Sequence, residues 1–147
     1  MKSFVFALIS SAVIGAVLIK ADFDNARTKA VYNKCLNAHP LPPGEEQHFK
    51  KKDIVPSSRN AKCLIACLLK EGKILSDGKY SLDMALKVAD EINKDRPENN
   101  KKAKEVTQKC ATEVGTDVGS DDCEFAYKMF VCVREEGKKV KLETPNY

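Results

Sequence analysis

Apolar residues recur at intervals of three and four along most of the chain, and polar or proline-containing stretches interrupt them. This spacing places apolar side chains on one face of a helix. Together with capping residues and prolines at the ends, it predicts six helices, at about residues 24–38, 43–51, 57–71, 82–94, 100–114 and 121–137. No stretch shows a convincing alternation of apolar and polar residues, so the predicted fold class is all-α.

The helix predicted at 57–71 is apolar on almost every side. A helix of this kind usually lies at the centre of a fold. It contains the stretch CLIACLLKEG, in which Cys63 and Cys67 are one helical turn apart. Two thiols in this arrangement suit three hypotheses: a metal site, a redox pair, or two disulfides to other parts of the chain.

The first 21 residues follow another pattern. Lys2 precedes an apolar run from Phe4 to Ile19, and the small residue Ala21 follows before polar sequence. This order is typical of a secretory signal peptide, and the run is shorter than the roughly 20 residues of a membrane-spanning helix. We therefore predict a signal peptide at 1–21, cleaved after Ala21 or alternatively after Ala16; an uncleaved membrane anchor fits less well. One secreted domain follows at 22–147, with a polar tail at 138–147.

Charge does not identify a partner. The predicted mature chain has 23 basic and 21 acidic residues and is nearly neutral. Its lysine clusters at 50–52, 101–104 and 138–141 are dispersed over helix ends and the tail, as expected of solvated surfaces. We therefore expect no nucleic-acid partner.

All six cysteines follow the predicted signal peptide: Cys35, Cys63, Cys67, Cys110, Cys123 and Cys132. An even number in an exported chain predicts three disulfides, because the environment outside the cell is oxidising. The β-carbons of Cys63 and Cys67 would lie about 5–6 Å apart in a helix, too far for a mutual disulfide. Cys123 and Cys132 would lie about 13 Å apart along the helix predicted at 121–137, which also excludes a disulfide between them. Excluding both bonds reduces the 15 possible pairings to ten, and helix geometry does not choose among these.

The competing chemistries have weaker support. C-x3-C is not the usual spacing of a zinc site, and the only histidines, His39 and His48, stand in a proline-rich linker and on a charged short helix. A redox role would favour C-x-x-C beside a βαβ unit, and no catalytic motif is present. We therefore expect no metal, no cofactor and no enzymatic activity. Helices held by disulfides need not fill the space between them, which leaves room for an apolar cavity.

The complete cysteine pattern is C-x27-C-x3-C-x42-C-x12-C-x8-C. It resembles the insect odorant-binding protein family, which includes the pheromone-binding and general odorant-binding proteins. The x3 and x8 gaps match the two that hardly vary in that family, and Asp77-Gly78 is similar to a turn found there. The resemblance implies the disulfides Cys35–Cys67, Cys63–Cys123 and Cys110–Cys132. It also implies six short helices, caged by three interlocked disulfides, around an apolar pocket.

Candidate ligand-binding residues are apolar positions on the predicted helices and in the tail, although the same spacing also suits a plain core. They are Val31, Ile65, Leu68, Leu69, Leu82, Ala85, Leu86, Ala89, Val114, Met129, Phe130, Val133 and Leu142. Three tyrosines offer hydroxyl groups that could orient a ligand: Tyr32, Tyr80 and Tyr127. Val140 and Leu142 would let the tail fold over a pocket, whereas a frayed polar terminus is the alternative.

The sequence thus favours a secreted carrier of small apolar organic ligands through extracellular fluid. The resemblance implies a membrane chemoreceptor as a further partner, and we expect a monomer or a weak homodimer. The alternative is a secreted, disulfide-caged effector or signalling protein that presents its surface to a protein partner.

Overall fold

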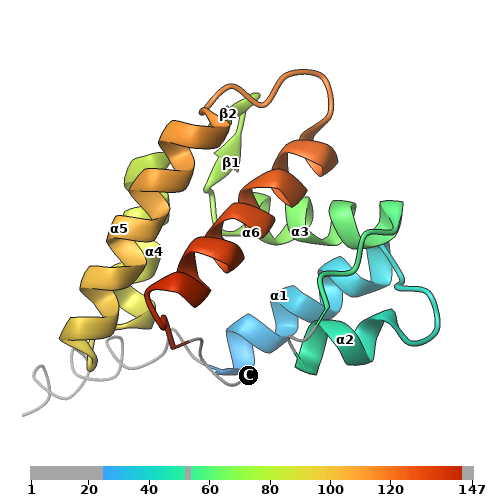
Figure 1. The fold of residues 1–147 in the computed structure, drawn as a ribbon. Coiled ribbons are helices and arrows are strands. Elements are labelled where there is room, and N and C mark those ends of the chain that lie inside the picture. Colours follow the sequence, from blue (N-terminus) through green and yellow to red (C-terminus); the bar gives the residue numbers. More distant parts are fainter. Residues whose placement is uncertain (1–24, 52–53, 144–147) are drawn as a thin grey trace, which may run out of the picture.

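The computed structural model describes residues 25–51 and 54–143, so the predicted signal peptide and the last four residues of the tail lie outside the described part. Six helices make up most of it, which confirms the all-α fold class (Figure 1). Their bounds are α1 Asn25–Ala38, α2 Glu45–Lys51, α3 Arg59–Glu71, α4 Leu82–Ile92, α5 Pro97–Val114 and α6 Asp122–Lys139.

Serine and aspartate side chains begin three of these helices. The Ser58 hydroxyl accepts a hydrogen bond from the Ala61 amide of α3 at 3.2 Å, and Ser81 does the same for Met84 of α4 at 3.2 Å. The Asp121 carboxylate accepts from the Glu124 amide of α6 at 3.0 Å. Each bond satisfies an amide that the first helical turn leaves without a partner, so these residues fix where the helices start.

Several helix boundaries differ from the prediction by two or three residues. Helix α5 begins at Pro97 instead of about residue 100, because proline at the first helical position loses no hydrogen bond and already has a helical φ angle. Helix α6 continues through Gly137 to Lys139, so the predicted tail at 138–147 begins two residues later.

A short β-hairpin, which the sequence analysis did not predict, precedes α4. Strand β1, Leu75–Ser76, pairs antiparallel with β2, Lys79–Tyr80, so that Leu75 faces Tyr80. The turn residues Asp77 and Gly78 both have positive φ angles, 50° and 71°, as a tight two-residue hairpin turn requires. Strands of two residues are too short to show an alternating pattern in the sequence.

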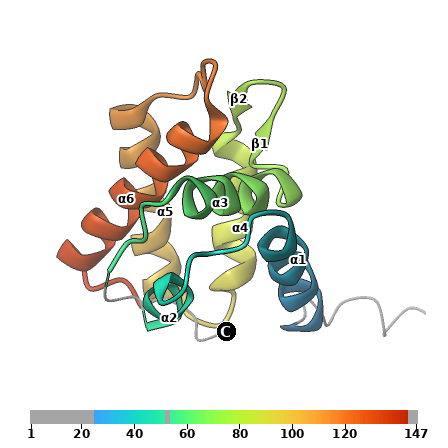
Figure 2. The same cartoon turned by 90° about the vertical axis from the view of Figure 1, so that its right-hand side faces the viewer.

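Helix α3 crosses the middle of the molecule, with α1 on one side and α6 on the other (Figure 2). Helix α6 also packs on α5, and α5 packs on α4. The central position predicted for α3 agrees with its buried residues Ala61, Leu64, Ile65 and Ala66. Among the described residues, Leu64 is the largest side chain that is fully buried, followed by Cys35 and Cys110. Other large apolar side chains, Ile65, Leu75, Phe125 and Met129, are also buried, at 3–6% exposure, and belong to one packed core.

Three disulfides connect the helices, and all six cysteines take part. Cys35–Cys67 joins α1 to α3, Cys63–Cys123 joins α3 to α6, and Cys110–Cys132 joins α5 to α6. These are the pairs that the family resemblance implies. The two cysteines of CLIACLLKEG thus reach two different helices.

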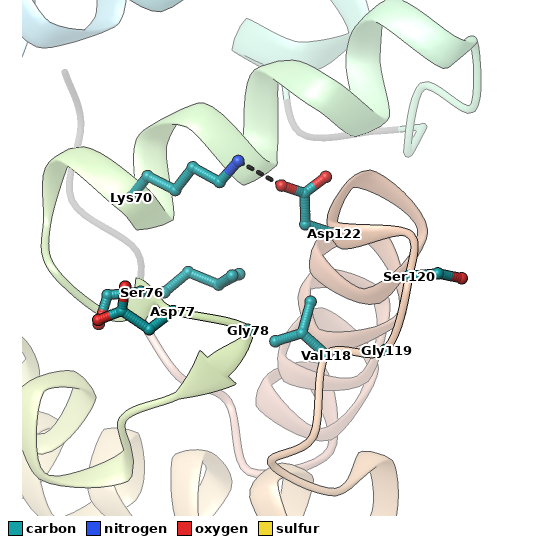
Figure 3. A pocket seen from close by; sticks show the side chains of 9 residues that line it. Lys70, Ser76, Asp77, Gly78, Val118, Gly119, Ser120 and Asp122 are labelled. Carbon is teal, nitrogen blue, oxygen red and sulfur yellow. Dashed lines mark hydrogen bonds and ion pairs between the residues drawn. The ribbon is translucent and has the colours of Figure 1, made fainter.

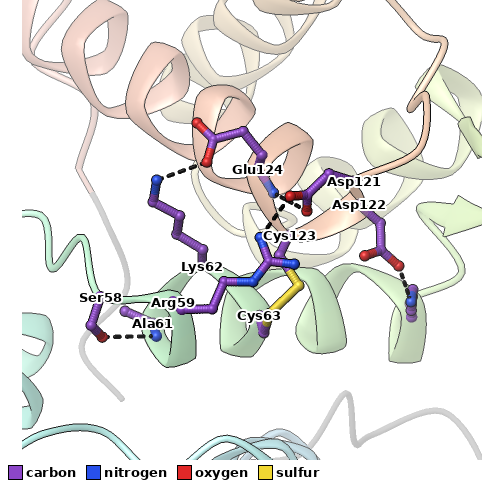
Figure 4. The surroundings of a disulfide bond; sticks show 10 residues. Ser58, Arg59, Ala61, Lys62, Cys63, Asp121, Asp122, Cys123 and Glu124 are labelled. Carbon is purple, nitrogen blue, oxygen red and sulfur yellow. Dashed lines mark hydrogen bonds and ion pairs between the residues drawn. A yellow bond between two sulfur atoms is a disulfide. The ribbon is translucent and has the colours of Figure 1, made fainter.

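Ion pairs surround the Cys63–Cys123 disulfide (Figure 4). They join α3 to the start of α6, and the pairs are Arg59–Asp121 and Lys62–Glu124, both at 2.7 Å, and Lys70–Asp122. Hydrogen bonds from Arg59 and Lys70 lower the pKa values of Asp121 and Asp122, respectively. Ion pairs this exposed contribute little to stability, but they favour one orientation of α6 on α3.

We expect the loss of the Cys63–Cys123 disulfide to cost more stability than the loss of Cys110–Cys132. The first spans 60 residues and the second 22. In the chain-entropy model these spans correspond to about 4.3 and about 3.4 kcal/mol, because a longer loop restricts the unfolded chain more. Urea denaturation of the variants Cys63→Ala/Cys123→Ala and Cys110→Ala/Cys132→Ala, followed by circular dichroism, measures both. An equal loss in the two variants, or the reverse order, would contradict the expectation.

Candidate functional site

An open, mostly apolar cleft of about 220 Å3 lies between α4 and α5. The hairpin contributes to one part of its wall, and the chain that follows α6 contributes to another. The lining residues are Ile74, Tyr80, Ala85, Val88, Ala89, Ile92, Asn93, Ala103, Thr107, Leu142 and Glu143. An apolar concave surface with a few polar groups is the usual form of a small-molecule site.

The sequence of the two helices explains why space remains between them. On α4, Ala85, Val88, Ala89 and Ile92 follow the helical spacing that places side chains on one face. The residues that α5 presents to the cleft, Ala103 and Thr107, are small and one turn apart. Small side chains on α5 leave part of the α4 face uncovered.

Tyr80 and Thr107 are the described lining residues whose side chains carry hydroxyl groups. The Tyr80 side chain is only 6% exposed, and its ring packs against Phe125 of α6 with 6.0 Å between the centroids. Burial raises the pKa of Tyr80 to about 12, so its hydroxyl stays protonated at physiological pH. The Thr107 hydroxyl donates a hydrogen bond to the carbonyl oxygen of Ala103 at 2.7 Å.

The chain reverses direction immediately after α6 and brings Leu142 to the cleft. Lys141 adopts a positive φ of 52°, its amide donates to the carbonyl of Lys138 at 3.2 Å, and the Leu142 amide donates to the carbonyl of Gly137 at 2.8 Å. These two bonds form a Schellman motif, which commonly ends helices. The Leu142 side chain packs on α6 at Gly137, where an added Cβ atom would lie 3.4 Å from it, in ordinary van der Waals contact.

A buried asparagine then holds the backbone of Glu143. The side-chain amide of Asn99, at the start of α5, donates to the Glu143 carbonyl at 2.8 Å and accepts from the Glu143 amide at 2.8 Å. Asn99 also donates to the Asn93 side chain at 2.6 Å, and Asn93 donates to the carbonyl of Ala89 on α4 at 2.9 Å. Both asparagines are buried, and these bonds satisfy polar groups that would be costly to leave without partners. The network connects α4, α5 and the tail at one end of the cleft.

The thirteen predicted ligand-binding residues occupy different environments. Three of them, Ala85, Ala89 and Leu142, line the cleft. Ile65 and Met129 are buried in the main core, and the half-buried Leu69, Leu82, Val114, Phe130 and Val133 pack against that core. Val31, Leu68 and Leu86 are half-buried on α1, α3 and α4. Phe130 stacks on Phe49 of α2, with 5.8 Å between the ring centroids. Contact of any of these side chains with a ligand stays a prediction.

Several lining residues were absent from the predicted set: Ile74, Val88, Ile92, Asn93, Ala103, Thr107 and Glu143. Val88 and Ile92 share the apolar face of α4 with Ala85 and Ala89, so helical periodicity could have included them. Ala103 and Thr107 gave no such signal, because small residues on a helix suit close packing equally well. Among the three candidate tyrosines, Tyr80 lines this cleft, whereas Tyr127 lies beneath the Lys62 ammonium group, 4.7 Å from the ring centroid.

A second cavity, of about 270 Å3, is larger but has a different chemistry (Figure 3). It lies between the hairpin turn, the end of α3 and the loop before α6, and most of its lining is polar. The Lys70 amino group and the Asp122 carboxylate point toward one another across it and form an ion pair. This cavity is therefore less suited to an apolar ligand than the cleft between α4 and α5.

Within residues 25–51 and 54–143, no helix is both long and apolar enough to cross a membrane.

Comparison with known proteins gives one family and several similar folds. The model of the PBP/GOBP family matches residues 22–136. The odorant-binding protein dmelOBP28a from Drosophila melanogaster is 28% identical, with a TM-score of 0.64 over 80% of this chain and 95% of that one. Odorant binding protein 5 from Apis mellifera is 19% identical, with a TM-score of 0.65 over 86% and 98% of the two chains.

A third structure extends the fold comparison. The fatty acid binding protein OBP56a from the oral disk of the blowfly Phormia regina is 17% identical, with a TM-score of 0.57 over 80% of this chain and 95% of that one. No curated protein sequence matched. At identities of 17% and 19%, the blowfly and honeybee structures support the fold alone.

We expect the substitution Asn99→Ala to release the tail from the end of the cleft. It removes both hydrogen bonds to the Glu143 backbone and lowers the free energy of unfolding by about 1–3 kcal/mol. The direct measurement is amide hydrogen exchange at Glu143, which should become at least about tenfold faster. Asn100→Ala is the matched control, because the neighbouring Asn100 bonds to Asp90 of α4 at 2.8 Å and not to the tail. Unchanged exchange at Glu143 in Asn99→Ala would show that other contacts hold the tail.

Proposed function

The chain belongs to the PBP/GOBP family, and from this premise we propose that it carries small hydrophobic ligands through an aqueous extracellular fluid. Membership confirms the resemblance inferred from the six cysteines. The similar structures from Drosophila, blowfly and honeybee are all named as binding proteins, and binding without catalysis is part of the proposal.

The apolar cleft between α4 and α5 is the observation that carries this function. Its wall offers apolar side chains from both helices, the hairpin and the tail, so a ligand that enters leaves water on several sides. At about 25 cal/mol per Å2, each 100 Å2 of apolar ligand surface that leaves water contributes about 2.5 kcal/mol. A micromolar complex corresponds to roughly 8 kcal/mol, and the loss of ligand freedom opposes binding, so the affinity depends on how much ligand surface the cleft covers.

The proposal includes export and delivery. The first 21 residues have the sequence of a secretory signal peptide, which supports release of the domain into an extracellular fluid. There the protein acts as a monomer or a weak homodimer and passes its ligand to a membrane chemoreceptor. It changes no bond in the ligand, because transport needs only reversible burial.

Filling the cleft should abolish ligand uptake without disturbing the rest of the fold. We expect Ala103→Leu, which places a larger side chain in the cleft, to weaken binding of the apolar fluorophore N-phenyl-naphthylamine by at least about fivefold. Fluorescence titration of the purified mature protein measures this affinity. The control is Ala30→Leu, which makes the same change at an exposed position of α1 and should leave the affinity unchanged.

Two results would contradict the proposal, the first its carrier function and the second its ligand site. One is a wild-type protein that binds no apolar probe at tens of micromolar, which would favour the effector alternative. The other is an Ala103→Leu variant that binds as well as Ala30→Leu, which would place the probe outside the cleft.

A further inference from the structure

Tyr80 is one of the two described cleft-lining residues that carry a hydroxyl group, and the other is Thr107. Tyr80 lies on β2, is 6% exposed and lines the cleft. A hydroxyl group that lines a ligand site can form hydrogen bonds with water or with a bound molecule. Because this hydroxyl keeps its proton at physiological pH, it can donate to an oxygen atom of a ligand.

Thr107, on α5, contributes a second hydroxyl group, with a different hydrogen-bonding role from that of Tyr80. The threonine hydroxyl uses its hydrogen for the bond to the Ala103 carbonyl, so its oxygen lone pairs remain as acceptors. A ligand hydroxyl both donates and accepts, and can therefore bond to Thr107 and Tyr80. A carbonyl group can accept from Tyr80 alone, and a pure hydrocarbon can use neither residue.

The charges around the cleft disfavour an anionic ligand. Its described lining residues include no lysine or arginine, and one of them, Glu143, carries a carboxylate. Arg96 lies beside the cleft, where its guanidinium donates to Asn93 at 3.0 Å and lies 3.8 Å from the Glu143 carboxylate. The Arg96 guanidinium therefore already interacts with two lining residues, Asn93 and Glu143. A ligand carboxylate would lose its hydration here without gaining a counter-ion.

The volume of the cleft limits the size of the ligand. A space of about 220 Å3 is below the roughly 300–1,000 Å3 of typical ligand sites. A short chain fits within this space, whereas a long fatty chain would extend out of it.

From these observations we infer that the cleft selects short, neutral, oxygen-containing apolar ligands, with alcohols preferred, and that Tyr80 and Thr107 determine this specificity. The inference rests on the proposed carrier function and narrows it to a ligand class. The apolar wall provides most of the affinity, and the two hydroxyl groups decide which functional group is accepted.

Displacement of bound N-phenyl-naphthylamine by compounds of equal chain length tests the specificity. The competitors are octanol, octanal, octane and octanoate at neutral pH. For the wild-type protein we expect octanol to bind at least about tenfold more tightly than octanoate, and octanal to lie between them. Hexadecanoate should compete no better than octanoate, because its added length finds no enclosed space.

Three variants assign the effect to named residues. Tyr80→Phe keeps the ring and should weaken octanol binding about three- to tenfold, while binding of octane and of the probe stays unchanged. Thr107→Val should weaken octanol more than octanal, because only the alcohol donates to Thr107. Tyr127→Phe is the matched control on α6, outside the cleft, and should bind all four compounds as the wild type does.

The outcomes separate the two proposals. A wild-type protein that binds neither probe nor competitors contradicts the carrier function itself. Probe binding with equal affinities for octanol and octanoate overturns the ligand class. Unchanged octanol affinity in both Tyr80→Phe and Thr107→Val overturns the assignment of the two residues. If Tyr80→Phe fails to fold, Thr107→Val alone tests the assignment of Thr107: an unchanged ratio of its octanol affinity to its octanal affinity, relative to the wild type, overturns it.

Discussion

The structure depends on two disulfides that leave one helix, α3, in different directions. Because Cys63 and Cys67 are one turn apart, they cannot bond to each other in a regular helix, and each reaches another helix. Cys67 holds α1, and Cys63 holds the start of α6. Helix α6 in turn holds α5 through Cys132. Four helices are therefore connected covalently, in an order that starts at the centre of the molecule.

Helix α4 stands outside this covalent frame, and the cleft lies between it and α5. The hairpin leads into α4, and α4 packs on α5. Hydrogen bonds and an ion pair between α4 and α5 add to this packing. Among them, Asp90 of α4 accepts from Asn100 at 2.8 Å and pairs with Lys104 at 2.6 Å. Both bonds lower the pKa of Asp90, with Lys104 contributing most. The candidate site thus forms where a disulfide-held helix meets one that is held only by non-covalent contacts. A fold of this kind keeps its helices in place without filling every space between them.

Much of this architecture could be predicted from local sequence signals. Helical periodicity gave the number and order of the helices, and the capping serines Ser58 and Ser81 marked two of their starts. The cysteine spacing indicated the family, and the family resemblance implied the disulfide pairs. Helix geometry alone had left ten possible pairings of the six cysteines. The short hairpin escaped prediction because only its Asp77-Gly78 turn has a sequence signal, and Pro97 was read as ending one helix when it begins the next.

The candidate site was less accessible to sequence reasoning, for a physical reason. A cleft results from what two surfaces fail to fill, and that depends on how they pack in space. Large apolar residues such as Ile65 and Met129 were natural candidates, yet they lie in the packed core. The space arises where α5 presents Ala103 and Thr107, which resemble ordinary packing residues in the sequence. The role of Asn99 could not be predicted either, because its partner, Glu143, is 44 residues away.

The central claim is that the disulfides keep the helices that form the ligand site in place. The most direct measurement compares the affinity for an apolar fluorophore of the oxidised protein and of the same protein after reduction and alkylation, with helix content followed by circular dichroism. The account predicts that the oxidised protein binds the probe in the micromolar range and that the reduced protein binds at least about tenfold more weakly. Equal affinities of the two forms would contradict it.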